Sequence, residues 1–138
     1  MSPNRRLFFH GFVFAALAPL AGFGVMGPVA NPRAMLSLHL ALWLSGAILC
    51  GAAAAWPLLQ LSTSATRWTE RGLVAGFWIG AAIGVVQGMF GTATMFAGGG
   101  IAPAWAEGLL KALQLGITVT LVPALIAMAI GLGRRQAA

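Results

Sequence analysis

Four long apolar segments follow one another along the chain, and short stretches between them hold most of its polar residues. The segments run from about 7 to 30, 34 to 61, 72 to 90 and 105 to 132. An α-helix needs about 20 apolar residues to cross a bilayer, a length that each segment reaches or approaches. The pattern predicts an all-α protein, a four-transmembrane-helix bundle in which residues 1–138 form a single membrane domain.

The connections between the segments differ in character. Asn31 is expected to cap the second helix, with Pro32 at the first helical position, where no N–H group is needed. Residues 62–71 are polar and are expected to form a short loop. Residues 91–104 are rich in glycine and alanine, so they are expected to lie at the membrane interface or to fold back into the bundle.

Composition supports the membrane assignment. Hydrophobic residues make up 59% of the 138 positions and charged residues only 7%, whereas about a quarter of the residues in a water-soluble domain are charged. The formal net charge of +6 comes from scattered basic residues without an accompanying polar surface. We therefore expect the lipid membrane as a partner and no nucleic acid.

The basic residues predict the orientation, because loops rich in arginine and lysine stay in the cytoplasm. With four spans, only Arg33 and Lys111 fall on the second side of the membrane. This predicts a multi-pass protein of a bacterial-type inner (cytoplasmic) membrane, with both termini cytoplasmic. The other basic residues are predicted to lie on the first side of the membrane, the cytoplasmic one: Arg5, Arg6, Arg67, Arg71, Arg134 and Arg135.

The third segment carries glycine at every fourth position. Such spacing lets helix backbones approach closely, which is how helices in lipid gain packing energy. A period of four drifts by about 40° per step around a helix of 3.6 residues per turn, so the stripe can serve more than one neighbour. Its partner can be a helix of the same subunit or of another subunit. The stripe consists of Gly72, Gly76, Gly80, Gly84 and Gly88.

His39 is the most informative polar residue of the spans, since ionisable side chains in hydrocarbon are costly and imidazole is the commonest metal ligand. It lies seven residues after Pro32, or about 10 Å of helix rise. His10 approaches from the opposite membrane face, about 20 Å away along the axis. The two histidines therefore cannot bind one metal within a subunit. His39 is either a single ligand or a histidine hydrogen-bonded to a neighbouring helix, and spacing alone favours the second interpretation.

Other polar side chains offer weaker signals. Glu107 stands four residues before Lys111 at the start of the fourth segment, which suits a stabilising ion pair or a proton-transfer group. Gln87 is a buried amide of the kind that joins helices by hydrogen bonds. Gln114 of the fourth span is a similar amide, and Ser45 and the tryptophans Trp43, Trp56 and Trp78 complete the set of polar-tipped residues within the spans.

The chain resembles the hydroxylaminobenzene mutases, small membrane enzymes that rearrange an arylhydroxylamine to an aminophenol. The resemblance covers most of the chain and rests on short motifs in the same order: Asn31-Pro32-Arg33, Leu36-Ser37, His39-Leu40, Phe90-Gly91-Thr92, Ala97-Gly98-Gly99-Gly100, Ala102-Pro103, Trp105 and Glu107.

More distantly, the chain is similar to the styrene oxide isomerases. That resemblance implies a homotrimer with haem b between subunits and an axial histidine on the second helix, which corresponds to His39. It implies that ferric iron acts there as a Lewis acid that opens an epoxide to an aldehyde. The glycine after His10 also matches that family.

The chain departs from both families at polar positions. Their asparagine six residues after the histidine is Ser45 here, and their aromatic-Ala-Asn triplet is Trp78-Ile79-Gly80. The active-site tyrosine of the epoxide isomerases aligns with Gly84. The resemblance therefore supports binding of the cofactor better than any particular reaction, although Gln87 could replace a lost amide.

These observations together predict an isomerase or mutase for a small apolar aromatic substrate that enters from the bilayer, of the arylhydroxylamine or aryl epoxide type. His39 is expected to hold haem iron. Ser45, Trp78 and Gln87 are expected to line the substrate side, with Glu107 as a proton-transfer group.

Two other functions are compatible with the sequence. A haem-binding membrane sensor or carrier without catalysis is the first, and it suits the lost polar groups. A small multidrug transporter is the second, but proton-coupled transporters need an acid within the membrane. No predicted span has a central aspartate or glutamate.

Overall fold

The structure, a computed structural model, describes residues 2–92 and 101–134. Within these residues all regular structure is helical, and the four α-helices are long and apolar enough to cross a membrane. The prediction of an all-α, four-helix membrane protein is confirmed. The elements are α1 (Arg5–Gly24), α2 (Pro32–Ala55), the short 3-10 helix η1 (Trp56–Leu58), α3 (Thr63–Phe90) and α4 (Ala104–Gly133).

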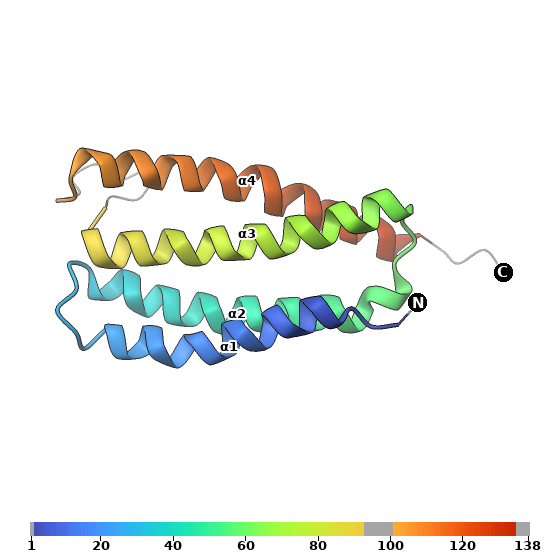
Figure 1. The fold of residues 1–138 in the computed structure, drawn as a ribbon, viewed down its shortest axis with the longest axis horizontal. Helices are drawn as coiled ribbons and strands as arrows, with labels where there is room; N and C mark the ends of the chain where they lie inside the picture. Colours follow the sequence, from blue (N-terminus) through green and yellow to red (C-terminus); the bar gives the residue numbers. More distant parts are fainter. Residues whose placement is uncertain (1, 93–100, 135–138) are drawn as a thin grey trace.

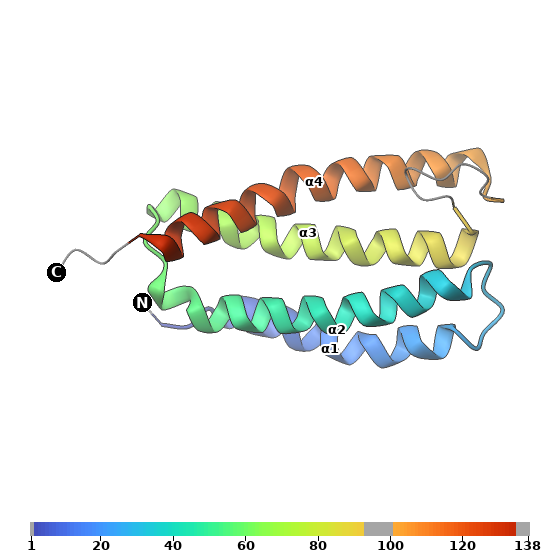
Figure 2. The same cartoon turned by 180° about the vertical axis from the view of Figure 1, so that it is seen from behind.

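The helices form two antiparallel hairpins. α1 lies beside α2, and α3 lies beside α4, while α2 and α3 join the hairpins (Figure 1). The reverse view shows the same order, with α4 on the far side of α3 from α1 and α2 (Figure 2). The arrangement places α3 in the middle and leaves most of α4 facing outward, toward lipid in a membrane.

The helix starts follow from capping side chains. Asn31 Oδ1 accepts from the N–H of Ala34 at 3.1 Å, with Pro32 at the first position of α2, so the predicted cap is confirmed. Ser62 Oγ accepts from the N–H of Ala65 at 3.3 Å and starts α3. The predicted loop at 62–71 is therefore wrong. These polar residues form the first turns of α3, which begins at Thr63.

Two other boundaries also differ from the apolar pattern. α1 ends at Gly24 and not near residue 30, because Gly27 and Pro28 follow it and favour turns. α2 ends at Ala55, where η1 with Pro57 takes over. Hydropathy continues through both turns, so it cannot locate them. The glycine-rich residues 93–100 of the third connection lie outside the described residues.

Backbone hydrogen bonds hold the ends of the helices together. At one end Asn4 N–H donates to Ala53 O at 3.1 Å, and Gln60 N–H donates to Gly131 O at 3.0 Å. At the other end Asn31 N–H donates to Gly88 O at 3.0 Å. The first of these ends collects most of the described basic residues: Arg5, Arg6, Arg67, Arg71 and Arg134. Arg135 lies outside the described residues.

The glycine stripe of α3 contacts two neighbours within the subunit. Its first part meets α4: a Cβ at Gly76 would lie 2.6 Å from Leu121 Cβ, and one at Gly72 would lie 2.9 Å from Thr120 O. Its later part meets α2, where a Cβ at Gly84 would lie 2.8 Å from Leu38 Cδ1. The expected winding of the stripe is confirmed, and both partners belong to the same chain.

Gly76→Ala is expected to destabilise the protein by about 1–3 kcal/mol, because the added methyl group meets the backbone and Cβ of Leu121. Gly51→Ala is the matched control, since nothing lies within 4 Å of a Cβ there, and it should be neutral or stabilising. Thermal unfolding in detergent measures both. Equal melting temperatures for the two variants would show that α3 and α4 do not pack this closely.

Candidate functional site

His39 lies on α2 against α1, half-buried, with Nδ1 2.7 Å from the carbonyl oxygen of Ala18. A carbonyl oxygen only accepts, so Nδ1 carries the hydrogen in this contact. The neutral ring then has its lone pair on Nε2, which is the form that binds a metal while a backbone carbonyl orients the ring. The structure shows the hydrogen bond to the neighbouring helix that the spacing favoured, and this bond does not use Nε2.

Glycine makes room for this imidazole. A Cβ at Gly22 would lie 3.0 Å from His39 Nδ1 and 3.4 Å from Cε1, closer than most real Cβ contacts. Beside the seam between α1 and α2 the surface is apolar: Leu36 and Trp43, one turn to either side of His39, are 49% and 48% exposed. His39 therefore borders an apolar surface that in a membrane faces lipid or another subunit.

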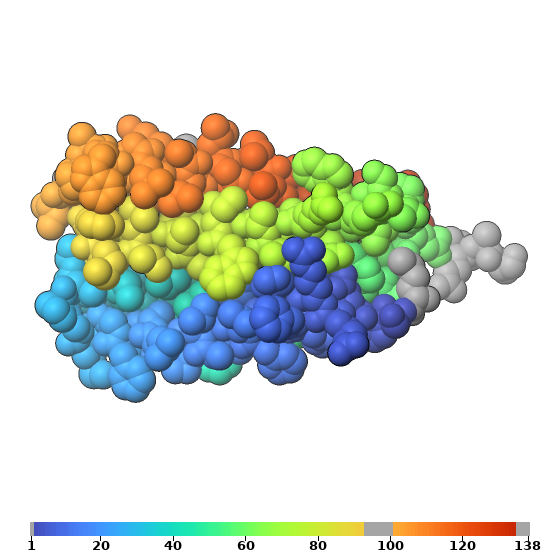
Figure 3. Space-filling view, in the orientation of Figure 1, coloured from blue at the N-terminus to red at the C-terminus, as the bar shows by residue number. Residues whose placement is uncertain are grey.

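A cavity of about 560 Å³ lies between α1, α2 and α3. Figure 3 shows α2 at the bottom of the groove between α1 (blue) and α3 (yellow-green). Trp78 and Val85 lie on its α3 side and are 37% and 46% exposed. The residues that line it are nearly all apolar: Leu17, Leu20, Ala21, Met35, Leu38, Leu42, Trp78, Ala81, Ala82, Val85 and Val86. His39 is not among them.

Trp78 lines this cavity and also forms a hydrogen-bonded pair with His10. Its indole N–H donates to His10 Nδ1 at 3.2 Å, across from α3 to α1. Its ring also packs on Phe14, with ring centroids 4.7 Å apart. Sequence reasoning did not find the His10–Trp78 pair, because 68 residues separate the two and only the packing of α1 on α3 brings them together.

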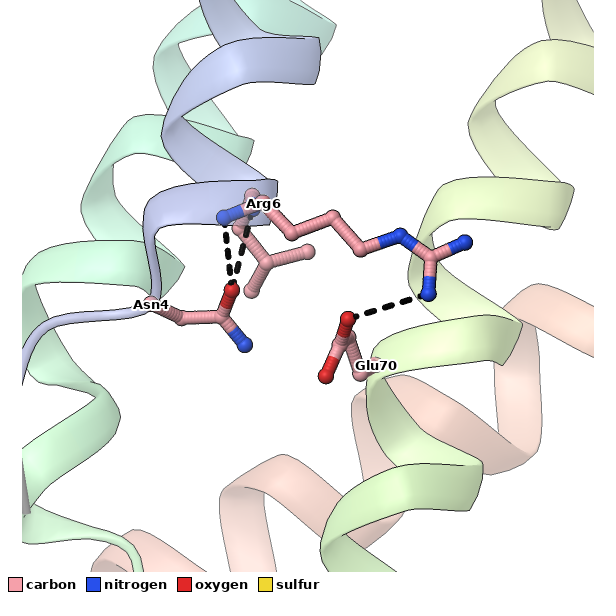
Figure 4. A network of polar contacts seen from close by, with 4 residues as sticks. Asn4, Arg6 and Glu70 are labelled. Carbon is pink, nitrogen blue, oxygen red and sulfur yellow. Dashed lines mark hydrogen bonds and ion pairs between the residues drawn. The ribbon is translucent and has the colours of Figure 1, made fainter.

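An ion pair lies one turn before His10 along α1. Arg6 Nη1 is 3.3 Å from Glu70 Oε1, while the backbone N–H groups of Arg6 and Leu7 donate to the Asn4 cap (Figure 4). Glu70 falls in the stretch 62–71 that was expected to form a loop, and this expectation is wrong. Because α3 begins at Thr63, Glu70 is helical and reaches α1.

The predicted site residues do not form one cluster. Ser45 lies on α2 seven residues after Leu38 and is not among the residues that line the cavity. Gln87 lies in the last turn of α3, and Glu107 lies in the first turn of α4, near the end of the molecule away from Arg6. Trp78 lines the cavity and His39 lies at the α1–α2 seam. Among residues 2–92 and 101–134, no three His, Cys, Asp or Glu side chains gather as a metal site.

The histidines also lie closer together than expected. His39 is level with Ala18, which follows His10 by eight residues, or about 12 Å of helix rise. The expected separation was about 20 Å, because α1 was expected to extend to residue 30. At this distance the two side chains still contact different residues, Ala18 and Trp78.

Comparison with known proteins gives one match. The family model described as styrene oxide isomerase matches residues 3–133. No curated protein matches the chain, and no solved structure matches it.

Nitrogen-15 NMR of histidine-labelled, haem-free protein should show opposite tautomers for the two histidines. His39 should carry its hydrogen on Nδ1, which donates to Ala18, and neutral His10 should carry it on Nε2, because its Nδ1 accepts from Trp78. The His39→Ala variant assigns the signals. If His39 proves to be protonated on Nε2, the contact with Ala18 does not orient the ring as described.

Proposed function

Because the chain belongs to the styrene oxide isomerase family, we propose that it is a membrane-embedded isomerase that rearranges a small apolar aromatic substrate of the aryl epoxide or arylhydroxylamine type. The family points to isomerase activity of the epoxide type. Such a reaction moves bonds within one molecule, so it needs no external electron donor. The four apolar helices suit a substrate that partitions into the bilayer.

The observation that carries the proposal is the orientation of His39. Its Nδ1 is held by Ala18 O at 2.7 Å, Gly22 leaves space for the ring, and the surface alongside is apolar. An imidazole oriented beside an apolar surface suits a flat apolar cofactor, so His39 would hold the iron of haem b. When bound, haem would supply a Lewis acid that polarises the substrate oxygen.

The residues of the chain would bind and shield the substrate. The apolar lining of the cavity would hold an aromatic ring and exclude water, which keeps a reactive intermediate from being hydrolysed. Trp78 would form one wall, and the Ser45 hydroxyl would orient the substrate from α2. Gln87 and Glu107 would act at the later end of α3, Glu107 in proton transfer.

We also propose a homotrimer. Within one subunit His39 lies at the α1–α2 seam while the cavity lies between α1, α2 and α3. The exposed apolar side chains beside His39, Leu36 and Trp43, suit contact with a further copy of the chain.

The proposed location is an inner membrane with both termini in the cytoplasm. The clustering of arginines at the end where α1 begins and α4 ends supports this orientation. Tags at either terminus should be reachable from the cytoplasmic side only.

A non-catalytic haem sensor or carrier is the second candidate, and one observation favours it. The position that aligns with the family tyrosine is Gly84, whose Cβ would already meet Leu38. The oxygen-bearing side chain is therefore absent, and a side chain at this position would require Leu38 to move, while the proposed haem ligand is present.

Purified protein made with ample haem should show a Soret absorption band, and His39→Ala should lose or strongly weaken it, because the iron then has no axial ligand. His10→Ala is the control and should keep the band, since His10 contacts Trp78 and not the α1–α2 seam. A colourless wild-type protein would rule out haem.

Styrene oxide and phenylhydroxylamine should be rearranged slowly by haem-loaded protein without an electron donor. Ser45→Asn should raise the rate roughly tenfold if the restored amide donates a hydrogen bond to developing charge on the substrate. Ser37→Asn is the matched control, since Ser37 is exposed on the same helix, and it should leave the rate unchanged. Product analysis by chromatography measures all three proteins.

A protein that binds haem but converts neither substrate, with or without Ser45→Asn, would contradict the isomerase proposal and support the sensor or carrier.

A further inference from the structure

The hydrogen bond between Trp78 and His10 connects the apolar cavity to a titratable side chain. The indole ring of Trp78 lines the cavity, and its N–H donates to His10 Nδ1 at 3.2 Å. The two rings meet edge to face, with centroids 6.3 Å apart. An indole nitrogen can only donate, so the contact requires a lone pair on His10 Nδ1. It therefore exists only while His10 is neutral.

His10 lies where protons can reach it. It is half-buried, one helical turn after Arg6, whose ion pair with Glu70 closes the same end of the α1–α3 contact. Arg6 on α1 and Glu70 on α3 are the charged groups that act on it. On α2, the thiol of Cys50 lies against the adjacent Gly11. The end of the bundle that holds Arg6 also holds Arg5, Arg67, Arg71 and Arg134, and such a group of charges favours contact with water.

We infer that His10 is a positioning residue for substrate binding, because its Nδ1 holds the Trp78 indole as one wall of the α1–α2–α3 cavity and its protonation releases that wall. The chemical class of the bound molecule, a small aromatic hydrocarbon or its oxygenated derivative, is taken from the proposed function, and to that extent the inference rests on it. A protonated imidazole donates at both nitrogens and cannot accept from Trp78. The indole N–H then loses its partner in apolar surroundings, which is unfavourable, so the ring moves.

The experiment uses styrene, which has the aromatic part of the expected substrate but no oxygen to react. Full-length protein with nitrogen-15 in its tryptophan side chains gives separate indole signals in NMR, and Trp78→Phe assigns the signal of Trp78. Titration with styrene should move this signal to saturation at about pH 8. The affinity should fall about fivefold at about pH 5, the ratio expected for the loss of one hydrogen bond.

Variants of His10 separate positioning from general structure. His10→Leu cannot accept a hydrogen bond, so its styrene affinity should be about fivefold weaker at both pH values. His10→Asn places an amide oxygen near the position of Nδ1, so its affinity should equal that of the wild type and should not depend on pH. Phe12→Leu, an exposed position on the same helix, is the matched control and should behave as the wild type.

One further variant identifies the titrating group. Glu70→Gln removes the carboxylate that pairs with Arg6 beside His10, and the pH dependence of styrene binding should persist in it. Equal styrene affinity for wild type and His10→Leu, or a pH dependence that survives in His10→Asn, would overturn the inference. If His10→Leu does not fold, the pH titration of the wild type beside His10→Asn gives the same decision.

The binding measurement needs neither haem nor turnover. A failure of styrene oxide to react, with styrene bound as described, would therefore contradict the proposed function and leave the role of His10 standing. Turnover of styrene oxide without any effect of His10 on styrene binding would contradict the role of His10 and leave the proposed function standing.

Discussion

Lipid tails are as apolar as a leucine side chain, so helices in a membrane associate chiefly through close packing and polar contacts between them. In this protein glycine provides the close packing at each helix interface. Gly46 of α2 meets Gly11 O of α1, Gly76 of α3 meets Leu121 of α4, and Gly84 of α3 meets α2. The placement of every polar side chain discussed above depends on these approaches, because they fix how each helix is rotated against its neighbour.

Polar groups in the spans find their partners on the adjacent helix. His39 reaches the backbone of α1 because Gly22 has no side chain in its way, and the same contact leaves its second nitrogen with a lone pair. His10 and Trp78 satisfy each other between α1 and α3. The two histidines thus have separate environments, one beside an apolar surface suited to a flat cofactor and one beside the cavity. This separation is consistent with the proposed division of work, in which His39 would hold a cofactor and His10 would shape the cavity.

The chain belongs to the styrene oxide isomerase family. Its resemblance to that family is uneven between the proposed cofactor ligand and the polar groups expected around the substrate. The proposed ligand His39 is present, but Gly84 and Gly80 stand where the resemblance expects a tyrosine and an asparagine. Gly84 is needed for the α2–α3 approach, because a Cβ there would lie 2.8 Å from Leu38 Cδ1. The pocket that remains is apolar, and it suits binding of an aromatic ring better than strong polarisation of its substituents.

The sequence by itself determined the number and type of the helices, the Asn31 cap and the winding of the glycine stripe. It also identified His39 as an ionisable side chain within a predicted span. These features are local: hydropathy over about 20 residues predicts a span, and spacing along one helix predicts which residues share a face. The family follows from the sequence as well, whereas haem, the trimer and the roles of the site residues remain proposals.

Only the tertiary structure decided where α1 and α3 begin or end relative to the apolar segments, and which side chains meet. Ser62 caps α3 ten residues before the apolar segment begins at 72, so Glu70 is a helical partner of Arg6. The contact of His10 with Trp78 joins residues 68 positions apart. Such contacts depend on the rotation and axial register of one helix against another. Many residues set these together by packing, and no single segment of sequence records them.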